Sequence, residues 1–181
     1  MFTYTIDDEL SLKLIEPNDA KELYQLTDQS RDHLRTWLGW VDGNDSIEHT
    51  EGFIKMGMKK YAENEGVSTC IIYKDEIAGI IGTHATDWTN RSASIGYWLG
   101  EAFIGRGIMT RATRAMTDYL LGDLKLNRVE IRAAARNTSS RSIPERLGFT
   151  KEGQIRQAEW LYDHYVDHVV YSILAEEWKR E

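Results

Sequence analysis

Cysteine is almost absent from this chain of 181 residues, in which Cys70 is the only one. A single thiol cannot close an intrachain disulfide, as expected for a protein of a reducing compartment. No thiol-activating pattern surrounds Cys70, so we interpret it as a core residue and not as a nucleophile. Long apolar runs are also missing, and the first residues contain neither a basic nor a hydrophobic segment. The sequence therefore predicts a cytoplasmic protein that does not cross a membrane.

Proline, repeats and metal-ligand clusters are scarce as well. The chain has two prolines, no internal repeat and no low-complexity tract. Its length is sufficient to bury a sizeable core, and we expect a single domain over residues 1–181. His49 and His84 are isolated, and no Ser/His/Asp pattern stands out. We therefore expect no bound metal and no nucleophilic triad.

Negative charge predominates, but it is distributed unevenly. The formal net charge is −7, yet residues 105–147 contain nine Lys and Arg against four Asp and Glu. A basic segment within an acidic chain suits an anionic cofactor, with an amine substrate approaching elsewhere. Chance clustering of surface arginines is the alternative explanation. So acidic a chain is a poor candidate for binding nucleic acid.

The most informative stretch is residues 95–111. It opens with the alternation of a strand and continues, after Gly107, with apolar residues at helical spacing. Gly100 and Gly105 lie between the two patterns. Glycines at a strand-to-helix junction allow a sharp turn and leave backbone amides uncovered, so that these amides can converge on an anion. The pattern predicts a phosphate-binding loop.

Two common phosphate-binding loops do not fit this stretch. A nucleotide P-loop would place Lys-Ser or Lys-Thr after Gly105, where the chain has Arg106-Gly107. A Rossmann turn would place a third glycine at position 110, which is Thr110. A glycine-rich turn without a ligand remains an alternative.

Residues 104–109 resemble a third kind of loop, the acyl-CoA loop of the GCN5-related N-acetyltransferases (GNAT), Gln/Arg-x-x-Gly-x-Gly/Ala. Gly107 matches the central glycine, and Gly105 matches a glycine that usually follows the first position of the signature. Ile104 and Met109 depart from its two outer positions. Residues 137–140 and 145–149 resemble the Asn-x-x-Ser and Glu-Arg-x-Gly-Phe signatures of the same superfamily.

Residues 157–159, Gln-Ala-Glu, are similar to the ribosomal-protein N-acetyltransferases of the RimJ/RimL type. The resemblance implies a mixed α/β fold with a mostly antiparallel central sheet and flanking helices. Strands 95–99 and 128–135 would run parallel and splay apart at the cofactor site. A helix is expected over residues 137–147. Because a proline is tolerated only in the first turn of a helix, Pro144 predicts that this helix begins late, near Ser140. A polar connector is expected over residues 156–164.

The implied cofactor is acetyl-CoA. Amides of the glycine loop would hold its pyrophosphate, an asparagine amide would fix its pantetheine arm, and strand backbone would polarise the thioester carbonyl. The residues expected to bind it are Trp98, Leu99, Ile104, Gly105, Arg106, Gly107, Ile108, Met109, Thr110, Asn137 and Ser140.

Two residues are expected to move protons. Glu159 matches the catalytic glutamate of the RimL-type pattern and is our candidate base, acting directly or through a water. Asp163 and His164 are the alternative bases. In the non-functional interpretation, Glu159 is only a solvated carboxylate in a loop. Ser140 is the candidate acid toward the leaving thiol, unless it only caps the helix. Trp37 and Trp40 resemble the two tryptophans of a Trp-Leu-x-Trp segment that lines the acceptor side in RimJ/RimL-type enzymes. Alternatively, they only cover an edge of the core.

The sequence thus predicts an acetyl-CoA-dependent N-acetyltransferase that acts by direct transfer in a ternary complex. The expected acceptor is the N-terminal α-amine of a ribosomal protein. A small amine such as a polyamine or aminoglycoside is the second hypothesis, and a non-catalytic acyl-CoA-binding regulator is the third. Exposed tryptophans make a homodimer reasonable.

Overall fold

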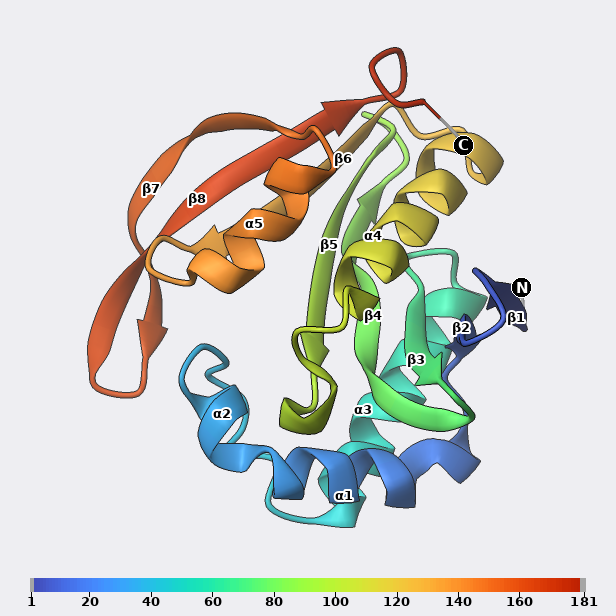
Figure 1. Cartoon of the computed structure of the whole chain (residues 1–181), viewed down its shortest axis with the longest axis vertical. Coiled ribbons are helices and arrows are strands. Elements are labelled where there is room, and N and C mark those ends of the chain that lie inside the picture. Colours follow the sequence, from blue (N-terminus) through green and yellow to red (C-terminus); the bar gives the residue numbers. More distant parts are fainter. Residues whose placement is uncertain (1, 180–181) are drawn as a thin grey trace.

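The computed structural model describes residues 2–179 and is organised around an eight-stranded sheet with the strand order β1-β2-β3-β4-β5-β6-β8-β7 (Figure 1). The strands are β1 (Thr3–Thr5), β2 (Leu10–Leu14), β3 (Ser68–Tyr73), β4 (Glu76–Asp87), β5 (Ser92–Leu99), β6 (Arg128–Ala134), β7 (Thr150–Leu161) and β8 (His164–Leu174). The α-helices are α1 (Ala20–Gln29), α2 (Arg31–Arg35), α3 (Ile47–Ala62), α4 (Ile108–Asp118) and α5 (Thr138–Arg146). Neighbouring strands are antiparallel except β5 and β6, so the predicted mixed, mostly antiparallel α/β fold is confirmed.

Helices pack on both faces of the sheet and divide the core into two clusters. Side chains alternate between the faces along a strand, and Ile80 and Ile81 of β4 illustrate this: Ile80 packs with α1 and α3, and Ile81 with α4 and α5. Cys70 lies in the α1/α3 cluster and is fully buried, as predicted for a core residue. Within residues 2–179 no helix is long and apolar enough to cross a membrane.

The parallel strands β5 and β6 separate along their length. They pair only over Ser92–Ile95 and Arg128–Ile131. Beyond this point β5 continues to Leu99 beside β4, while β6 continues to Ala134 beside β8. The predicted splay is therefore present, and it separates the last residues of the two strands.

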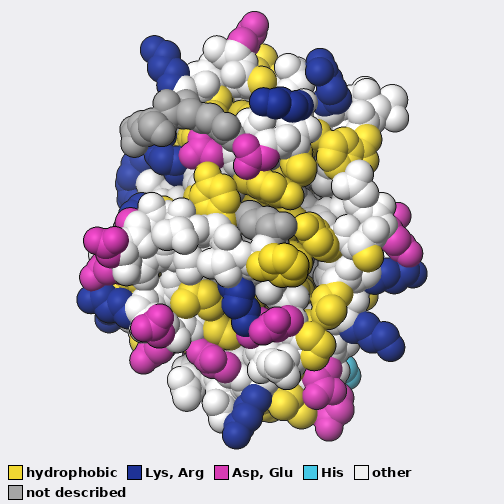
Figure 2. Space-filling view, turned by 90° about the vertical axis from the view of Figure 1, so that its right-hand side faces the viewer, with side chains coloured by type: hydrophobic (Ala, Val, Ile, Leu, Met, Phe, Trp, Pro, Cys, Tyr) yellow, Lys and Arg dark blue, Asp and Glu magenta, His cyan; other side chains and the backbone are white. Residues whose placement is uncertain are grey.

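The face of the molecule beside α4 and β1 carries charges of both signs (Figure 2). Hydrophobic side chains gather at its middle, and Lys and Arg alternate with Asp and Glu around them.

The hairpin formed by β7 and β8 corrects one expectation. Residues 156–164 are not a polar connector, because β7 runs to Leu161 and β8 begins at His164. β7 is one of the two edge strands and is exposed along most of its length, so its sequence does not need an apolar alternation.

Helix α5 corrects another. It begins at Thr138, with Asn137 as its cap, and not near Ser140. Pro144 lies inside it and lacks the amide that would bond to the Ser140 carbonyl. That carbonyl accepts the hydroxyl of Tyr97 instead (3.1 Å), so a side chain of β5 compensates for the proline.

Candidate functional site

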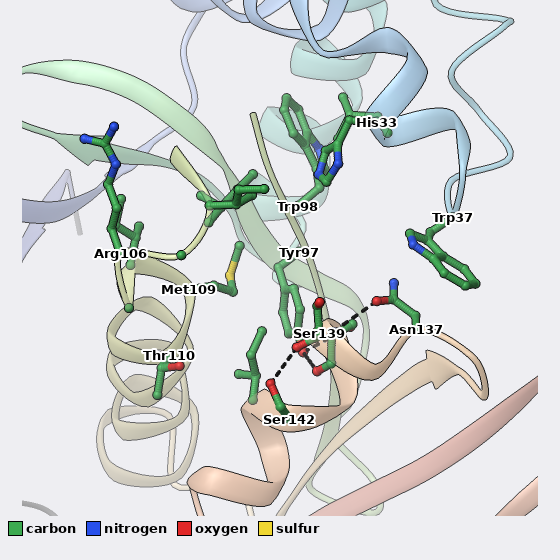
Figure 3. A pocket seen from close by; sticks show the side chains of 18 of the residues that line it. His33, Trp37, Tyr97, Trp98, Arg106, Met109, Thr110, Asn137, Ser139 and Ser142 are labelled. Atoms are coloured by element: carbon green, nitrogen blue, oxygen red, sulfur yellow. Dashed lines mark hydrogen bonds between the residues drawn. The ribbon is translucent and has the colours of Figure 1, made fainter. Parts of the chain in front are cut away.

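A cavity of about 560 Å³ opens between the end of β5, the turn into α4, the start of α5 and α2 (Figure 3). Every residue predicted to bind the cofactor lines it, namely Trp98, Leu99, Ile104, Gly105, Arg106, Gly107, Ile108, Met109, Thr110, Asn137 and Ser140. Trp37 lines the cavity as well, whereas Trp40 does not. Sequence reasoning assigned no role to Tyr97, His33 or Arg146, which also contribute to the lining.

The glycine loop forms one end of this cavity. Gly105 and Gly107 have φ values of +76° and +70°, in the left-handed region that side chains disfavour. Gly107 is the N-cap of α4, so the amides that follow it have no partner within the helix and can bond to an anion. The geometry fits the pyrophosphate of a coenzyme A despite the atypical Ile104 and Met109.

Two arginines add positive charge to the same end. Arg106 and Arg146 both line the cavity, and no carboxylate within residues 2–179 forms an ion pair with either of them. Arg146 donates to the hydroxyls of Thr110 (3.1 Å) and Ser142 (2.9 Å), which joins α5 to the first turn of α4. Its place in the 145–149 motif and in the basic segment was the signal that could have identified it.

Ser140 lies at the start of α5, where Figure 3 shows this helix beside Tyr97 and Asn137. The Ser140 amide donates to Asn137 Oδ1 (3.1 Å), so Asn137 is the cap and the capping interpretation of Ser140 is wrong. The Ser140 hydroxyl makes one long hydrogen bond, 3.5 Å to the Tyr97 hydroxyl oxygen. Burial raises the pKa of Tyr97 to about 12, so this phenol stays protonated at neutral pH.

Glu159 lies in β7 on the sheet face opposite α5. Its strand partner is Val166, and Val169 and Tyr171 pack in the core beneath α5. Because side chains alternate along β8, Val166 and His168 point to the other face, and Glu159 points there with them. Glu159 Oε2 lies 2.9 Å from His168 Nε2.

Glu159 is not part of the cavity lining, but the loop after α2 extends from the cavity to this residue. A Cβ added to Gly39 would lie 3.7 Å from Glu159 Oε1. One residue further on, Trp40 contacts Trp98, with ring centroids 5.8 Å apart. Because Trp98 lines the cavity, an aromatic wall extends from the cavity toward Glu159.

The alternative bases lie elsewhere. Asp163 is in the exposed turn between β7 and β8 and bonds to the adjacent His164 (2.6 Å), which lowers the pKa of the Asp163 carboxyl. Neither residue lines the cavity. His84, in β4, has its ring against Gly96. Desolvation and then the charge of Lys60 lower the pKa of His84, and the smaller, opposite effect of the Glu159 charge does not reverse this. In residues 2–179 no three His, Cys, Asp or Glu side chains are arranged to hold a metal.

Comparisons with known proteins agree with this geometry. The model of the "Acetyltransferase (GNAT) domain" matches residues 9–150. The Bacillus subtilis (strain 168) protein named "Putative ribosomal N-acetyltransferase YdaF" is 37% identical over 182 aligned positions and 100% of both chains. The ribosomal-protein-serine acetyltransferase of Escherichia coli (strain K12) is 30% identical over 170 positions, which cover 94% of this chain and 95% of that protein.

Solved structures share the fold. The ribosomal L7/L12 alpha-N-protein acetyltransferase RimL, in complex with coenzyme A, superimposes with a TM-score of 0.92 at 27% identity, covering 95% of this chain and 97% of its own. The microcin C7 self immunity acetyltransferase MccE, in complex with acetyl-CoA and AMP, gives a TM-score of 0.89 at 31% identity, covering 93% and 94%.

Proposed function

Because this chain belongs to the acetyltransferase (GNAT) domain family and is an N-acetyltransferase, we propose that it transfers an acetyl group from acetyl-CoA to the N-terminal α-amine of a ribosomal protein. The proposal is carried by one observation: the cavity with its anion-binding loop lies at the splay of β5 and β6, and the carboxylate of Glu159 lies at the opposite face of the same splayed sheet. Relatives named for ribosomal-protein acetylation support the choice of acceptor.

An α-amine suits a site with a single carboxylate base. Its pKa is about 7.7 to 8.0, against about 10.4 for lysine, so near pH 7.5 roughly a third of α-amines are neutral but only about one lysine in a thousand. Glu159, directly or through a water, takes the proton that the amine loses as it attacks. The Glu159 side chain is 38% exposed, so an amine can reach it from solvent.

Ser140 acts at the other end of the reacting bond. Acetyl-CoA supplies the activated acetyl group, and the leaving thiol has a pKa near 8.5, so a hydrogen-bond donor at the sulfur assists its departure. The Ser140 hydroxyl is held only by a 3.5 Å bond to Tyr97 and can turn toward the cavity. The N-terminal end of α5 adds a favourable field for the developing negative charge.

The test is thiol release from acetyl-CoA against a panel of ribosomal-protein N-terminal peptides and small amines, with coenzyme A binding measured by calorimetry. We expect turnover with one group of peptides. Glu159→Gln should lower turnover, most severely at low pH, with coenzyme A affinity unchanged, and Ser140→Ala should slow transfer without abolishing it. Tight coenzyme A binding without turnover on any peptide would contradict the protein acceptor.

A small-molecule amine is the second candidate. The observation that favours it is the similarity to MccE, whose structure contains AMP beside acetyl-CoA, together with the aromatic wall of Trp40 and Trp98. The indole ring of Trp40 is exposed and can stack on a planar ring. Turnover with polyamines, aminoglycosides or amine-bearing nucleotides, and none with peptides, would select this function.

A further inference from the structure

We infer that His168 is a positioning residue that holds the carboxylate of Glu159 in the orientation needed to accept a proton from the acceptor amine. This inference rests on the proposed function and deepens it. It follows from the only hydrogen bond that the Glu159 side chain makes within residues 2–179, that between Glu159 Oε2 and His168 Nε2 at 2.9 Å.

A β-bulge brings the two residues together. Ile155 pairs with His168 and Glu159 pairs with Val166, so residues 156–158 of β7 stand opposite Asp167 alone. Asp167 Oδ1 accepts the amide of Gln157 (2.8 Å), which secures the bulge. In a regular register residue 157 would face Val166, and the carboxylate would lie two residues further from His168.

The chemistry of the pair assigns its hydrogen. To act as a base Glu159 must be ionised, and an ionised carboxylate only accepts hydrogen bonds. In the proposed arrangement, Nε2 of His168 must therefore carry the hydrogen and donate it to Oε2. Oε1 then remains available for the amine. It lies beside Gly39, and the missing side chain there leaves space next to this oxygen.

The side chain of His168 is more constrained by its surroundings than that of Glu159. β8 lies between β6 and β7, and His168 pairs with Ala134 on one side and with Ile155 on the other. Its side chain is 20% exposed against 38% for Glu159, which is in the edge strand. A glutamate has several rotamers to lose on ordering, so a hydrogen bond from a fixed neighbour pre-orders it before the acceptor binds.

The experiment compares His168→Leu, His168→Gln, Glu159→Gln and the double variant Glu159→Gln/His168→Leu in the acetyl-transfer assay with the preferred acceptor. We expect His168→Leu to lower kcat roughly tenfold with the KM for acetyl-CoA unchanged. His168→Gln retains an N–H donor and should stay within about threefold of the wild type. The double variant should be no slower than Glu159→Gln, because two residues of one unit are not additive.

A matched control is available on α3. His49 bonds to Asp45 (2.9 Å) in another His–carboxylate pair that is exposed and outside the cavity lining. His49→Leu should keep wild-type kcat. As a readout that a merely structural role would not move, 15N NMR should show His168 protonated at Nε2 in the wild type and a changed tautomer balance in Glu159→Gln.

The outcomes separate the role of His168 from the function of the whole site. Wild-type kcat in His168→Leu, equal loss in His168→Gln and His168→Leu, or additive losses in the double variant would each overturn the inference. Full activity of Glu159→Gln would remove Glu159 as the base, and the role of His168 with it. Absence of turnover in the wild type with every acceptor would instead contradict the proposed function.

Discussion

The hydroxyl of Tyr97 donates to the backbone carbonyl of Ser140 at 3.1 Å and so replaces the helical amide that Pro144 cannot supply. The same oxygen accepts the Ser140 hydroxyl at 3.5 Å. One β5 side chain thereby stabilises the first turns of α5 and contacts the candidate acid. The helix turn that carries the candidate acid therefore depends on this contact between a strand and a helix.

Tyr97→Phe should destabilise the protein by about 1–3 kcal/mol, because it leaves a partly buried carbonyl without a donor. Thermal unfolding measures the loss. Pro144→Ala restores an amide at that position and should recover much of the stability in the double variant Tyr97→Phe/Pro144→Ala. Equal melting temperatures of Tyr97→Phe with and without the proline replacement would contradict the compensation.

Gly107→Ala should weaken coenzyme A binding. The left-handed φ of +70° costs a side chain roughly 1–2 kcal/mol, and relaxing it would turn the first amides of α4 away from the anion. Gly107→Asn is the matched comparison, because asparagine tolerates this conformation better than alanine. Calorimetry should rank affinity as wild type, then Asn, then Ala. An alanine variant equal to the wild type would show that the left-handed conformation at residue 107 does not determine binding.

Arg146→Gln should lower coenzyme A affinity and reduce its dependence on salt. The guanidinium faces the cavity without a carboxylate partner in residues 2–179, so its charge is available to a phosphate. Arg156→Gln makes the same charge change on the exposed strand β7, outside the cavity lining, and should leave affinity unchanged. Similar losses in both variants would indicate a general charge effect.

Stability should fall below pH 4.5 partly through Glu152. The hydrogen bonds from Arg128 (2.6 Å to each carboxylate oxygen) and then Ser172 lower the pKa of Glu152 from 4.5 to about 2. A lowered native pKa means that the unfolded chain binds the proton first, so this contribution is complete above pH 4.5 and is lost as the pH falls toward 2.

Glu152→Gln should therefore be less stable than the wild type at pH 7. Its free energy of unfolding, measured with urea, should fall less steeply between pH 4.5 and 2. Glu176→Gln, at an exposed position outside this network, is the control and should keep the wild-type slope. An unchanged slope in Glu152→Gln would show that other carboxyl groups dominate acid unfolding.

Cys70 should not form a mixed disulfide with oxidised coenzyme A in the folded protein. The RimL structure in complex with coenzyme A contains a disulfide between the cofactor and one of that enzyme's own cysteines. In this chain the only thiol is fully buried, 3.7 Å from Asp19, and burial raises its pKa. Mass spectrometry should show the adduct only after unfolding; an adduct on the native protein would contradict the buried position.

The family, the fold class and the cofactor loop could be predicted from the amino-acid sequence alone, because these depend on local patterns. Glycines at 105 and 107 and the helical spacing after them specify a turn and a helix start without reference to the rest of the chain. Likewise, the residues expected to bind the cofactor all line one cavity. The short elements β1 and α2 were missed, because a few residues show no period.

The positions of the candidate acid and base depend on contacts that exist only in the folded chain. The continuation of α5 through Pro144 is supported by Tyr97, a donor from a distant strand that replaces the missing amide. The place of Glu159 in a strand, and its contact with His168, depend on a bulge in an edge strand, whose exposed residues carry no hydrophobic alternation to reveal the register. The contacts of Tyr97 with α5 and of His168 with Glu159 join segments that are distant in the sequence or lie in different strands. Such contacts leave no signal in the residue spacing of the segments that they join.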